Sequence, residues 1–574
     1  MRPVIAASSP PHRPGRADAL EETNSGPRIA RFLEPSRFRH FLSTLWLPLA
    51  SACGALALSL LLIRIPVSRY DEGFVLLNAA RVLDGDVPYR DFWTIYAPGQ
   101  FYTTAFFFQT IGESVLSERV WDTIARALLC VAVSTVARQL GISRFVALLL
   151  AWLIALWLSA GMMWGYAVVP ALALCLWAAV LLNRYLVTRR LAWLVAAGTA
   201  VGCSLLYRLD FGCYASTAAS LVVLLSTRVG YGSSSQTKVP RRFAGLPELV
   251  TMLGSVAAVA IGPTFYFISR SGIHLLWDSL IYWPVFMLHD VRGLPLPPLV
   301  PWNVQLEQLP MSWFRYLLLA WLPFYGPVLA YTVWAGIIAR LWRSNSTSPA
   351  YIWPHLYLAL LGVLLFSQSV SRFDRPHWLP TTIIASILVM SPVAWPSGVG
   401  RAKILVALSL GMVVSLPYLY SPAVGVFASA RAFPFFRCYS DIPAAGCTAV
   451  EKDQAEAIDY VLAHSLPGER IFVGNFRHDQ VLVNDMAFYF LAGRKAATRY
   501  HELHPGLVTT EEVQSEIISE LQEYDVKTVV IWHRGWPMEP NASSQSSSVF
   551  ALDGFLAGEF ATSLRTGDYE VRTR

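Results

Sequence analysis

Two adjacent carboxylates, Asp71 and Glu72, follow the first long apolar run of the chain, which covers about residues 42–65. A positioned carboxylate can take a proton from a hydroxyl group as a general base. Two like charges side by side also raise one of the two pKa values. An acidic pair beside a membrane surface is unfavourable unless it is hydrated, paired or used. The residue types alone leave two interpretations open, a reactive pair and a solvated helix start.

Cations gather in another segment between apolar runs, Ser371 to Trp378, with the sequence SRFDRPHW. It contains Arg372, Arg375 and His377 just before a further apolar run. A planar guanidinium group can bind a phosphate through two hydrogen bonds. Arginine at a membrane boundary is also a common interfacial anchor, so both roles stay open for these residues.

The composition indicates which elements must position these groups. The 574 residues are 55% hydrophobic and 14% charged, whereas a soluble domain is usually about one quarter charged. Apolar runs of about 20 residues recur along the chain, which is typical of a multi-span membrane protein. The net charge of +7 comes mostly from short loops and does not indicate nucleic-acid binding. The chain has no zinc-ligand spacing, P-loop or Rossmann glycine pattern, and a divalent cation is possible but not indicated.

The pattern predicts about eleven spans, a mainly α polytopic helical bundle. They cover residues 42–65, 121–137, 145–163, 168–182, 191–206, 214–225, 249–268, 314–338, 352–366, 379–393 and 404–419. The short apolar segment 100–111 is expected to lie along the outer interface. Basic residues mark the loops 183–190, 228–242, 340–343 and 398–403, which therefore face the cytoplasm.

The domain boundaries follow from this topology. Residues 1–40 are expected to be a disordered cytoplasmic tail, residues 41–421 the membrane domain, and residues 66–120 its first outer loop. Residues 422–574 have the composition of a soluble domain. An odd number of spans places that domain outside the cell, on the same side as Asp71, in a protein of the plasma (inner) membrane.

The soluble domain is predicted to be a small α/β domain. Helices are expected over residues 451–464, 486–491 and 513–524, and strands over residues 470–474 and 526–532. The sequence Thr509-Thr510-Glu511-Glu512 matches a capping box for the third helix. Cys438 and Cys447 lie together in a polar stretch and are a candidate disulfide on an oxidising side of the membrane.

The stretch from Arg69 to Gly99 reads RYDEGFVLLNAARVLDGDVPYRDFWTIYAPG. It resembles the first extracytoplasmic loop of the GT-C glycosyltransferases. These multi-span enzymes, which take a sugar from a polyprenyl-phosphate lipid, include the protein O-mannosyltransferases, the bacterial aminoarabinose transferase and related lipopolysaccharide sugar transferases. The resemblance rests on Asp71-Glu72-Gly73, on AARVLDGDVPYRDF and on the Pro-Gly before an apolar helix. It extends to Arg119, and beyond the first third of the chain it is only architectural.

One departure from the family pattern matters. Several members carry Lys-Pro-Pro where this chain has Ala97-Pro98-Gly99, so any role of that lysine must pass to another cation.

The resemblance implies an inverting transfer of one sugar from a polyprenyl-phosphate donor to an extracytoplasmic glycan, lipid or protein, with no required cofactor. Asp71 matches the family's functional aspartate and is expected to act as the general base. Glu72 is expected to share this role, bind the acceptor or help to hold a cation. The candidates for binding the donor phosphate are Arg372, Arg375, His377, Arg90 and Arg208. The candidates for binding the acceptor, or for supporting these cations, are Asp91, Asp210 and Asp374.

Two other function classes stay open, a non-catalytic lipid or glycan transporter and a structural membrane protein whose C-terminal domain binds a partner. The predicted spans carry almost no charge, which argues against a proton- or ion-coupled transporter. A lipid-sized groove beside Asp71 would favour the enzyme, and a through-going polar path would favour the transporter.

Overall fold

The computed structural model describes residues 35–160, 163–230, 245–300, 316–344, 349–394, 437–480, 483–534 and 539–574. The chain forms two units, Met1–Trp46 and Leu47–Arg574. All the contacts described below lie within the second unit.

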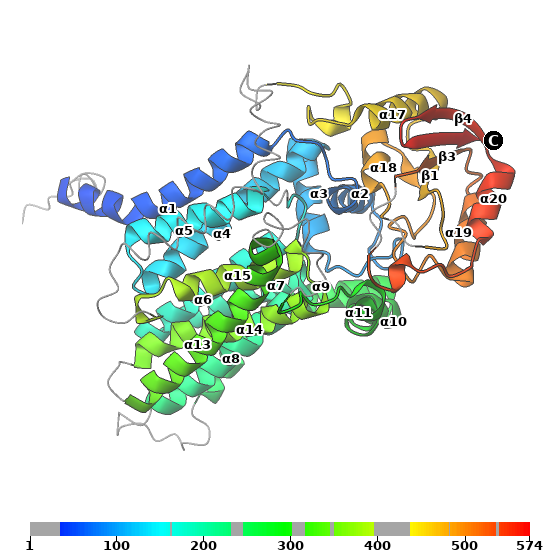
Figure 1. The fold of residues 1–574 in the computed structure, drawn as a ribbon. Coiled ribbons are helices and arrows are strands. Elements are labelled where there is room, and N and C mark those ends of the chain that lie inside the picture. Colours follow the sequence, from blue (N-terminus) through cyan, green and yellow to red (C-terminus); the bar gives the residue numbers. More distant parts are fainter. Residues whose placement is uncertain are drawn as a thin grey trace, which may run out of the picture. The chain divides into compact units, whose positions relative to one another are not determined.

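Long apolar helices form the membrane domain (Figure 1). They are α1 (Pro35–Leu62), α4 (Val115–Gln139), α5 (Arg144–Ala160), α6 (Val168–Thr188), α7 (Leu191–Tyr207), α8 (Leu209–Gly230), α9 (Leu246–Ser271), α13 (Leu322–Ser344), α14 (Pro349–Ser371) and α15 (Arg375–Val389). A short π-helix, η5 (Leu317–Trp321), leads into α13. Each predicted span within the described residues therefore coincides with a helix. The predicted span 404–419 and the predicted loop 398–403 lie outside the described residues.

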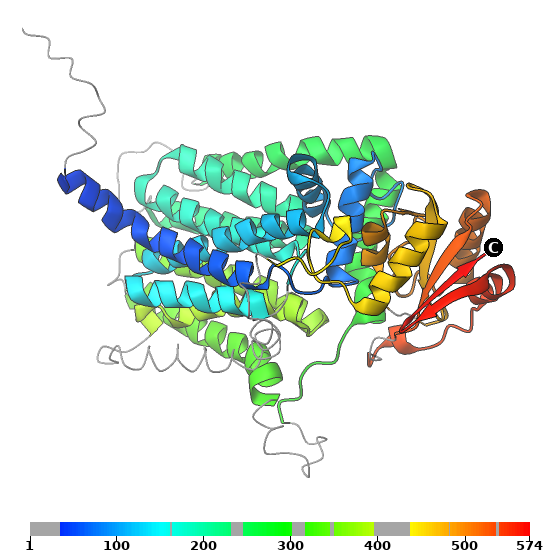
Figure 2. The same ribbon diagram turned by 90° about the horizontal axis from the view of Figure 1, so that it is seen from above.

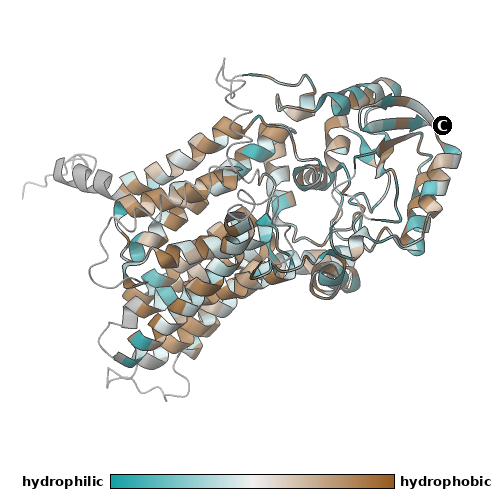
Figure 3. Ribbon diagram, in the orientation of Figure 1, coloured by the Kyte–Doolittle hydropathy of each residue, from teal (hydrophilic) through white to brown (hydrophobic). Residues whose placement is uncertain are grey.

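Seven helices in the described part of the chain are long and apolar enough to cross a membrane, which confirms a multi-pass membrane protein. They lie on α1, α4, α6, α8, α9, α13 and α14. The helices α5 and α7 are apolar but shorter, so the total of eleven spans stays a prediction. Figure 3 shows the apolar residues concentrated on the helices of the bundle.

The first outer loop contains two short helices, α2 (Asp71–Leu83) and α3 (Gly99–Ile111). The sequence predicts the first of them from Phe74, but it begins at Asp71, where two carboxylates in the first turn suit the positive end of the helix dipole. The ring of Phe74 packs edge-on against that of Phe101 at 5.3 Å, which joins the two helices. After α9, three short segments follow, α10 (Ile273–Trp277), the π-helix η3 (Asp278–Met287) and α11 (Leu288–Arg292).

The C-terminal domain is a five-stranded sheet with helices on both faces (Figure 2). Its elements are α17 (Lys452–His464), β1 (Arg470–Asn475), α18 (Met486–Ala492), β2 (Lys495–Ala496), α19 (Glu511–Glu523), β3 (Thr528–Trp532), α20 (Ala551–Glu559), β4 (Ala561–Thr566) and β5 (Tyr569–Thr573). The strand order is β2-β1-β3-β5-β4. The strands β2, β1 and β3 are parallel, and β5 is antiparallel to both β3 and β4.

The alternation of side chains along the central strands explains the two layers. Val473 and Val530 point to the face that α17 and α18 cover. Phe472 and Val529 point to the opposite face, under α19 and α20. The hydroxyl of Thr510 accepts a hydrogen bond from Val513 N, so a threonine of the predicted capping box caps α19. The helix begins at Glu511, two residues before the predicted start, and Val513 rather than a glutamate stands three residues after the cap. The sequence pattern does not indicate α20 or the hairpin β4–β5, whose first strand is mostly exposed and lacks an apolar alternation.

The first outer loop and the C-terminal domain share one hydrophobic core, although the sequence places them in different domains. Phe74 and Phe101 of the loop belong to the same buried cluster as Phe488 of α18. A Cβ atom on Gly73 would lie 2.3 Å from Ala487 N, so only glycine permits this close approach of α2 and α18. A disulfide joins Cys438 and Cys447, whose Cα atoms are 4.4 Å apart, just before α17.

Candidate active site

Asp71 is the first residue of α2, and its side chain is partly exposed. The hydroxyl of Tyr166 donates a hydrogen bond to its carboxylate. Burial raises the pKa of Asp71, and the nearby charge of Asp374 raises it further, against the opposing effects of Tyr166, Arg292 and Arg372. A carboxylate with a raised pKa is a stronger base once it is ionised.

The segment between α5 and α6 holds Tyr166 in place. Gly165 has a φ of +80° and packs against the backbone of α2, since a Cβ atom there would lie 3.2 Å from the Cα atom of Glu72. The N–H of Gly165 donates to Asp122 Oδ2 at 2.5 Å. Asp122 of α4 thereby fixes the loop that carries Tyr166, and so holds Tyr166 beside Asp71.

Glu72 lies next to Asp71 in the chain but is completely buried. Arg119 of α4 donates to both of its carboxylate oxygens, from Nε to Oε1 at 2.6 Å and from Nη2 to Oε2 at 2.8 Å. The same guanidinium donates from Nη1 to the carbonyl oxygens of Ile63 and Ile65, beyond the end of α1. A buried, doubly paired carboxylate is poorly placed to meet a substrate, so we assign Glu72 to holding the loop rather than to sharing the chemistry of Asp71.

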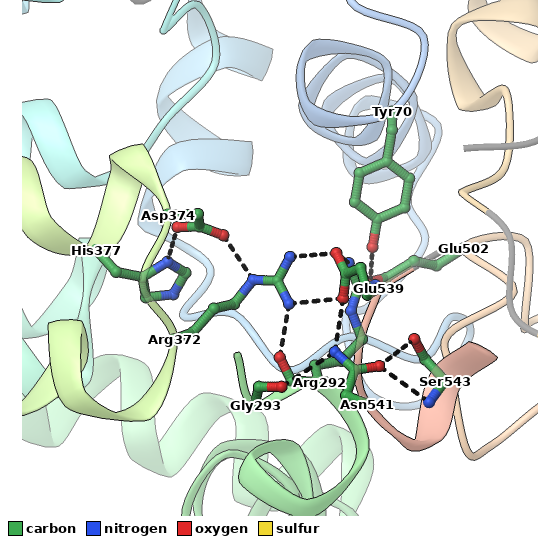
Figure 4. Close-up of polar contacts among 10 residues, drawn as sticks. All are labelled: Tyr70, Arg292, Gly293, Arg372, Asp374, His377, Glu502, Glu539, Asn541 and Ser543. Carbon is green, nitrogen blue, oxygen red and sulfur yellow. Dashed lines mark hydrogen bonds and ion pairs between the residues drawn. The ribbon is translucent and has the colours of Figure 1, made fainter. Parts of the chain in front are cut away.

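Arg372, between α14 and α15, makes the largest set of polar contacts in the segment 371–378. It donates from Nη2 to Glu539 Oε1 at 2.5 Å and from Nη1 to Glu539 Oε2 at 2.9 Å. Its Nε donates to Asp374 Oδ2 at 2.5 Å. Figure 4 shows the guanidinium of Arg372 between Asp374 on one side and Glu539 on the other. Its effect on the pKa of Asp71 places this charge in the neighbourhood of that carboxylate.

The other predicted residues of the segment lie beside Arg372. Asp374 is the N-cap residue of α15, and its Oδ1 pairs with Nδ1 of His377. Burial raises the pKa of Asp374, but the charges and hydrogen bonds of His377 and Arg372 lower it more strongly, to about 2. Asp374 is therefore ionised throughout the physiological range and supports these cations. Arg375 is the first residue of α15.

Arg292, the last residue of α11, belongs to the same group, although the sequence analysis did not select it. Its Nη2 donates to Glu539 Oε1 at 3.3 Å, and its backbone carbonyl accepts from Arg372 Nη1 at 2.6 Å. Its charge lowers the pKa of Asp71. The available signal was a cation shortly after His289 and Asp290, in a segment that the sequence predicts to face outward.

Arg208 and Asp210 pair with each other at the junction of α7 and α8. Arg208 donates from Nη2 to Asp210 Oδ2 at 2.7 Å, and Gln368 donates to the same oxygen. Arg208 also affects the pKa of Tyr96, as does Asp71. The charges of Arg208 and Asp71 therefore both act on Tyr96.

Arg90 and Asp91 form a separate pair on the surface of the first outer loop. Arg90 is exposed and donates from Nε and Nη2 to the two oxygens of Asp91 at 2.8 and 2.7 Å. Asp91 also accepts from Val87 N at 2.7 Å. The pair stabilises the turn after α2, and the structure gives it this role instead of a place beside Arg372.

The residue after Arg69 connects the site to the C-terminal domain. The hydroxyl of Tyr70 donates to Glu502 Oε1 at 2.8 Å, and both side chains are shown in Figure 4. Arg69 pairs with Glu451 at 2.6 Å and donates to the hydroxyl of Tyr569 at 2.9 Å. Asp71 is therefore directly preceded by two residues that anchor the loop to that domain. Within the described ranges, no group of three or more His, Cys, Asp or Glu side chains could hold a metal ion.

A bundle of membrane helices carries an outer-loop helix that begins with a carboxylate, and a small α/β domain packs on that helix. This arrangement is also seen in solved structures of other membrane proteins.

Solved structures with this fold include ArnT from Cupriavidus metallidurans. Its apo structure is 15% identical, with a TM-score of 0.55. Its structure bound to undecaprenyl phosphate is also 15% identical, with a TM-score of 0.52. Each match covers 92% of this chain and 98% of that chain. The S. cerevisiae protein O-mannosyltransferase Pmt1-Pmt2 complex aligns over 40% of this chain and 34% of its own, at 16% identity and a TM-score of 0.33. No protein-family model and no curated protein sequence matches this chain.

Proposed function

We propose that this chain is a membrane glycosyltransferase that moves one sugar from a polyprenyl-phosphate donor to an acceptor hydroxyl outside the cell. The observation that carries the proposal is the position of Asp71 directly after Tyr70, whose side chain lies beside the group formed by Arg372, Arg292 and Glu539 (Figure 4). The raised pKa of Asp71 agrees with a role as the base. A general base and a phosphate-binding cation are the two groups that such a transfer requires.

In the proposed reaction, Asp71 takes the proton of the acceptor hydroxyl. The acceptor oxygen forms a bond to the anomeric carbon while the bond from that carbon to the phosphate oxygen breaks. Attack on the face opposite the leaving phosphate inverts the anomeric centre. The phosphate leaves with one more negative charge than it had as a diester, so nearby guanidinium groups stabilise the transition state more than the bound donor.

The remaining predicted residues take supporting parts in this proposal. Asp374 and His377 orient Arg372, and the pair Arg208–Asp210 lines the side near Tyr96. Arg375, as the first residue of α15, is a further candidate for phosphate contact. We further propose that the N-terminus is cytoplasmic and the C-terminal domain extracytoplasmic, which places Asp71 on the side where lipid-linked sugars are used. The acceptor is a glycan, a lipid or a protein.

The proposal is tested by comparing the envelope glycans and lipids of the host with and without the gene, by mass spectrometry. Loss of one sugar unit in the deletion strain is expected, with recovery by the wild-type gene and no recovery by Asp71→Asn at equal protein level. Identical profiles in both strains, or full recovery by the variant, would contradict the enzymatic role and favour a transporter or a structural protein.

A further inference from the structure

The carboxylate of Glu539 is shared by two guanidinium groups. Arg372 contacts both of its oxygens, at 2.5 and 2.9 Å, and Arg292 contacts Oε1 at 3.3 Å. Figure 4 shows Glu539 facing these two side chains. The arginines belong to loops of the membrane domain, whereas Glu539 belongs to the C-terminal domain.

The C-terminal domain holds Glu539 in this position. The side-chain amide of Asn541 donates to Glu539 Oε2 at 2.9 Å and to the carbonyl of Gly293, next to Arg292, at 3.1 Å. Asn541 is the N-cap of the short 3-10 helix η9 (Ala542–Ser544) and accepts from Ser543 N at 3.1 Å. Burial raises the pKa of Glu539, but its contacts with Arg372 and Arg292 lower it more, to about 2. The carboxylate is therefore ionised at every pH at which a cell works.

A carboxylate and a phosphate present similar geometry to a guanidinium, since both offer two oxygens to the parallel N–H groups. The carboxylates of Glu539 and Asp374 together balance the charges of Arg372 and Arg292. Little electrostatic attraction is left for a further anion, and two anions on the same donors repel each other. A phosphate that binds Arg372 and Arg292 must therefore displace Glu539.

Arg292 also has donor capacity that the carboxylate does not use. Its Nε is buried and has no hydrogen-bond partner in the part of the chain that the structure describes. A buried donor without a partner is unfavourable. A phosphate offers more acceptor oxygens than a carboxylate, so it can satisfy this group where Glu539 does not.

We propose that Glu539 competes with the donor phosphate for Arg372 and Arg292, and that Arg292 is the second phosphate-binding cation of the site. This inference rests on the proposed function, because it needs a phosphate ligand at Arg372. Glu539 thus lowers the affinity of the site for the phosphate. When the product leaves, Glu539 pairs with the two guanidinium groups again.

The test measures the binding of undecaprenyl phosphate to the full-length protein in nanodiscs, with the uncharged alcohol undecaprenol as the matched ligand. Glu539→Gln removes the competing charge and is expected to increase the affinity for undecaprenyl phosphate about tenfold, since charge-assisted contacts are worth about that factor. Arg292→Gln is expected to decrease it about tenfold. Glu559→Gln, an exposed position of α20 in the same domain, should change neither, and the affinity for undecaprenol should be the same in all four proteins.

The opposite interpretation is that Glu539 only clamps the C-terminal domain to the membrane domain. On that interpretation Glu539→Gln weakens phosphate binding or leaves it unchanged, and either result overturns the inference. The proposed site is upheld separately if the wild type binds undecaprenyl phosphate more tightly than undecaprenol. A wild type without that preference overturns both. If Glu539→Gln does not fold, Glu539→Asp keeps the charge on a shorter side chain and is expected to bind undecaprenyl phosphate more tightly than the wild type. Unchanged or weaker binding by folded Glu539→Asp also counts against competition.

Discussion

Glu72 and Arg119 form a fully buried ion pair, with Arg119 Nε 2.6 Å from Glu72 Oε1, immediately behind the carboxylate of Asp71. Through this pair, α4 holds two segments in place: the chain just after α1 and the first turn of α2. The two adjacent acids therefore have different environments. Glu72 is buried against Arg119, and Asp71 is partly exposed.

Glu72→Gln should destabilise the protein strongly, because it leaves the Arg119 charge buried without its counter-ion. Breaking a buried pair in this way costs about 3–5 kcal/mol. The melting temperature of the purified protein in detergent measures the effect. Asp71→Asn, one position earlier, is the matched control and should melt close to the wild type. Equal melting temperatures for all three proteins would mean that the pair does not support the loop.

Asp71→Asn should lower the rate of sugar transfer by about 10²-fold or more, because asparagine keeps the shape but cannot accept the proton. Donor binding and membrane insertion should persist. Turnover of the purified variant with a polyprenyl-phosphate sugar is the measurement. The same change at Asp84, an exposed acid at the end of α2, should leave turnover unchanged. Full activity of Asp71→Asn would exclude Asp71 as the base.

Tyr166→Phe should move the acid limb of the pH–rate profile to higher pH. The hydrogen bond from Tyr166 stabilises the charged form of Asp71 and lowers its pKa, so its removal raises that pKa further. The base is then ionised only at higher pH, and activity is lost first on the acid side. Tyr102→Phe, at an exposed position of α3, serves as the control. An unchanged limb, or a shift to lower pH, would show that Tyr166 does not act on the base.

Arg372→Gln should weaken donor binding by about tenfold, with a smaller effect on the apparent affinity for the acceptor, because we propose that this guanidinium binds the donor phosphate. Binding of the polyprenyl-phosphate donor and the acceptor KM are measured separately. Arg90→Gln changes the exposed pair on the first outer loop and should have the smaller effect on donor binding. A larger loss of donor binding in Arg90→Gln than in Arg372→Gln would indicate that Arg90 binds the phosphate instead.

Reporter fusions test the proposed orientation. A fusion after Gly232 should report the cytoplasm and one after Ala449 the outside, because basic loops stay inside. The disulfide between Cys438 and Cys447 agrees with an oxidising compartment for the second position. The same signal from both fusions would reject the topology.

The amino-acid sequence by itself determined the elements whose cause is local. Apolar runs long enough to span a bilayer predicted the helices of the bundle, and the capping sequence at 509–512 predicted α19 to within two residues of its start. The short spacing of Cys438 and Cys447 predicted their pairing. These features depend on hydrophobic burial and on neighbours in the chain, so they can be read without the fold. The choice of Asp71 came from the resemblance of its loop to a known family, and its role as the base stays a prediction.

Only the tertiary structure decided which charges meet. Glu72 pairs with Arg119, 47 positions away, and Arg292 meets Glu539, 247 positions away. From the sequence alone, any acidic and basic residues of the loops predicted to face outward could form ion pairs. The packing of α2, α4, α11 and the C-terminal domain determines which of them meet. A charge interaction depends on distance and burial rather than on sequence spacing. The pairing of Glu72 with Arg119, and that of Arg292 with Glu539, therefore follow from the fold alone.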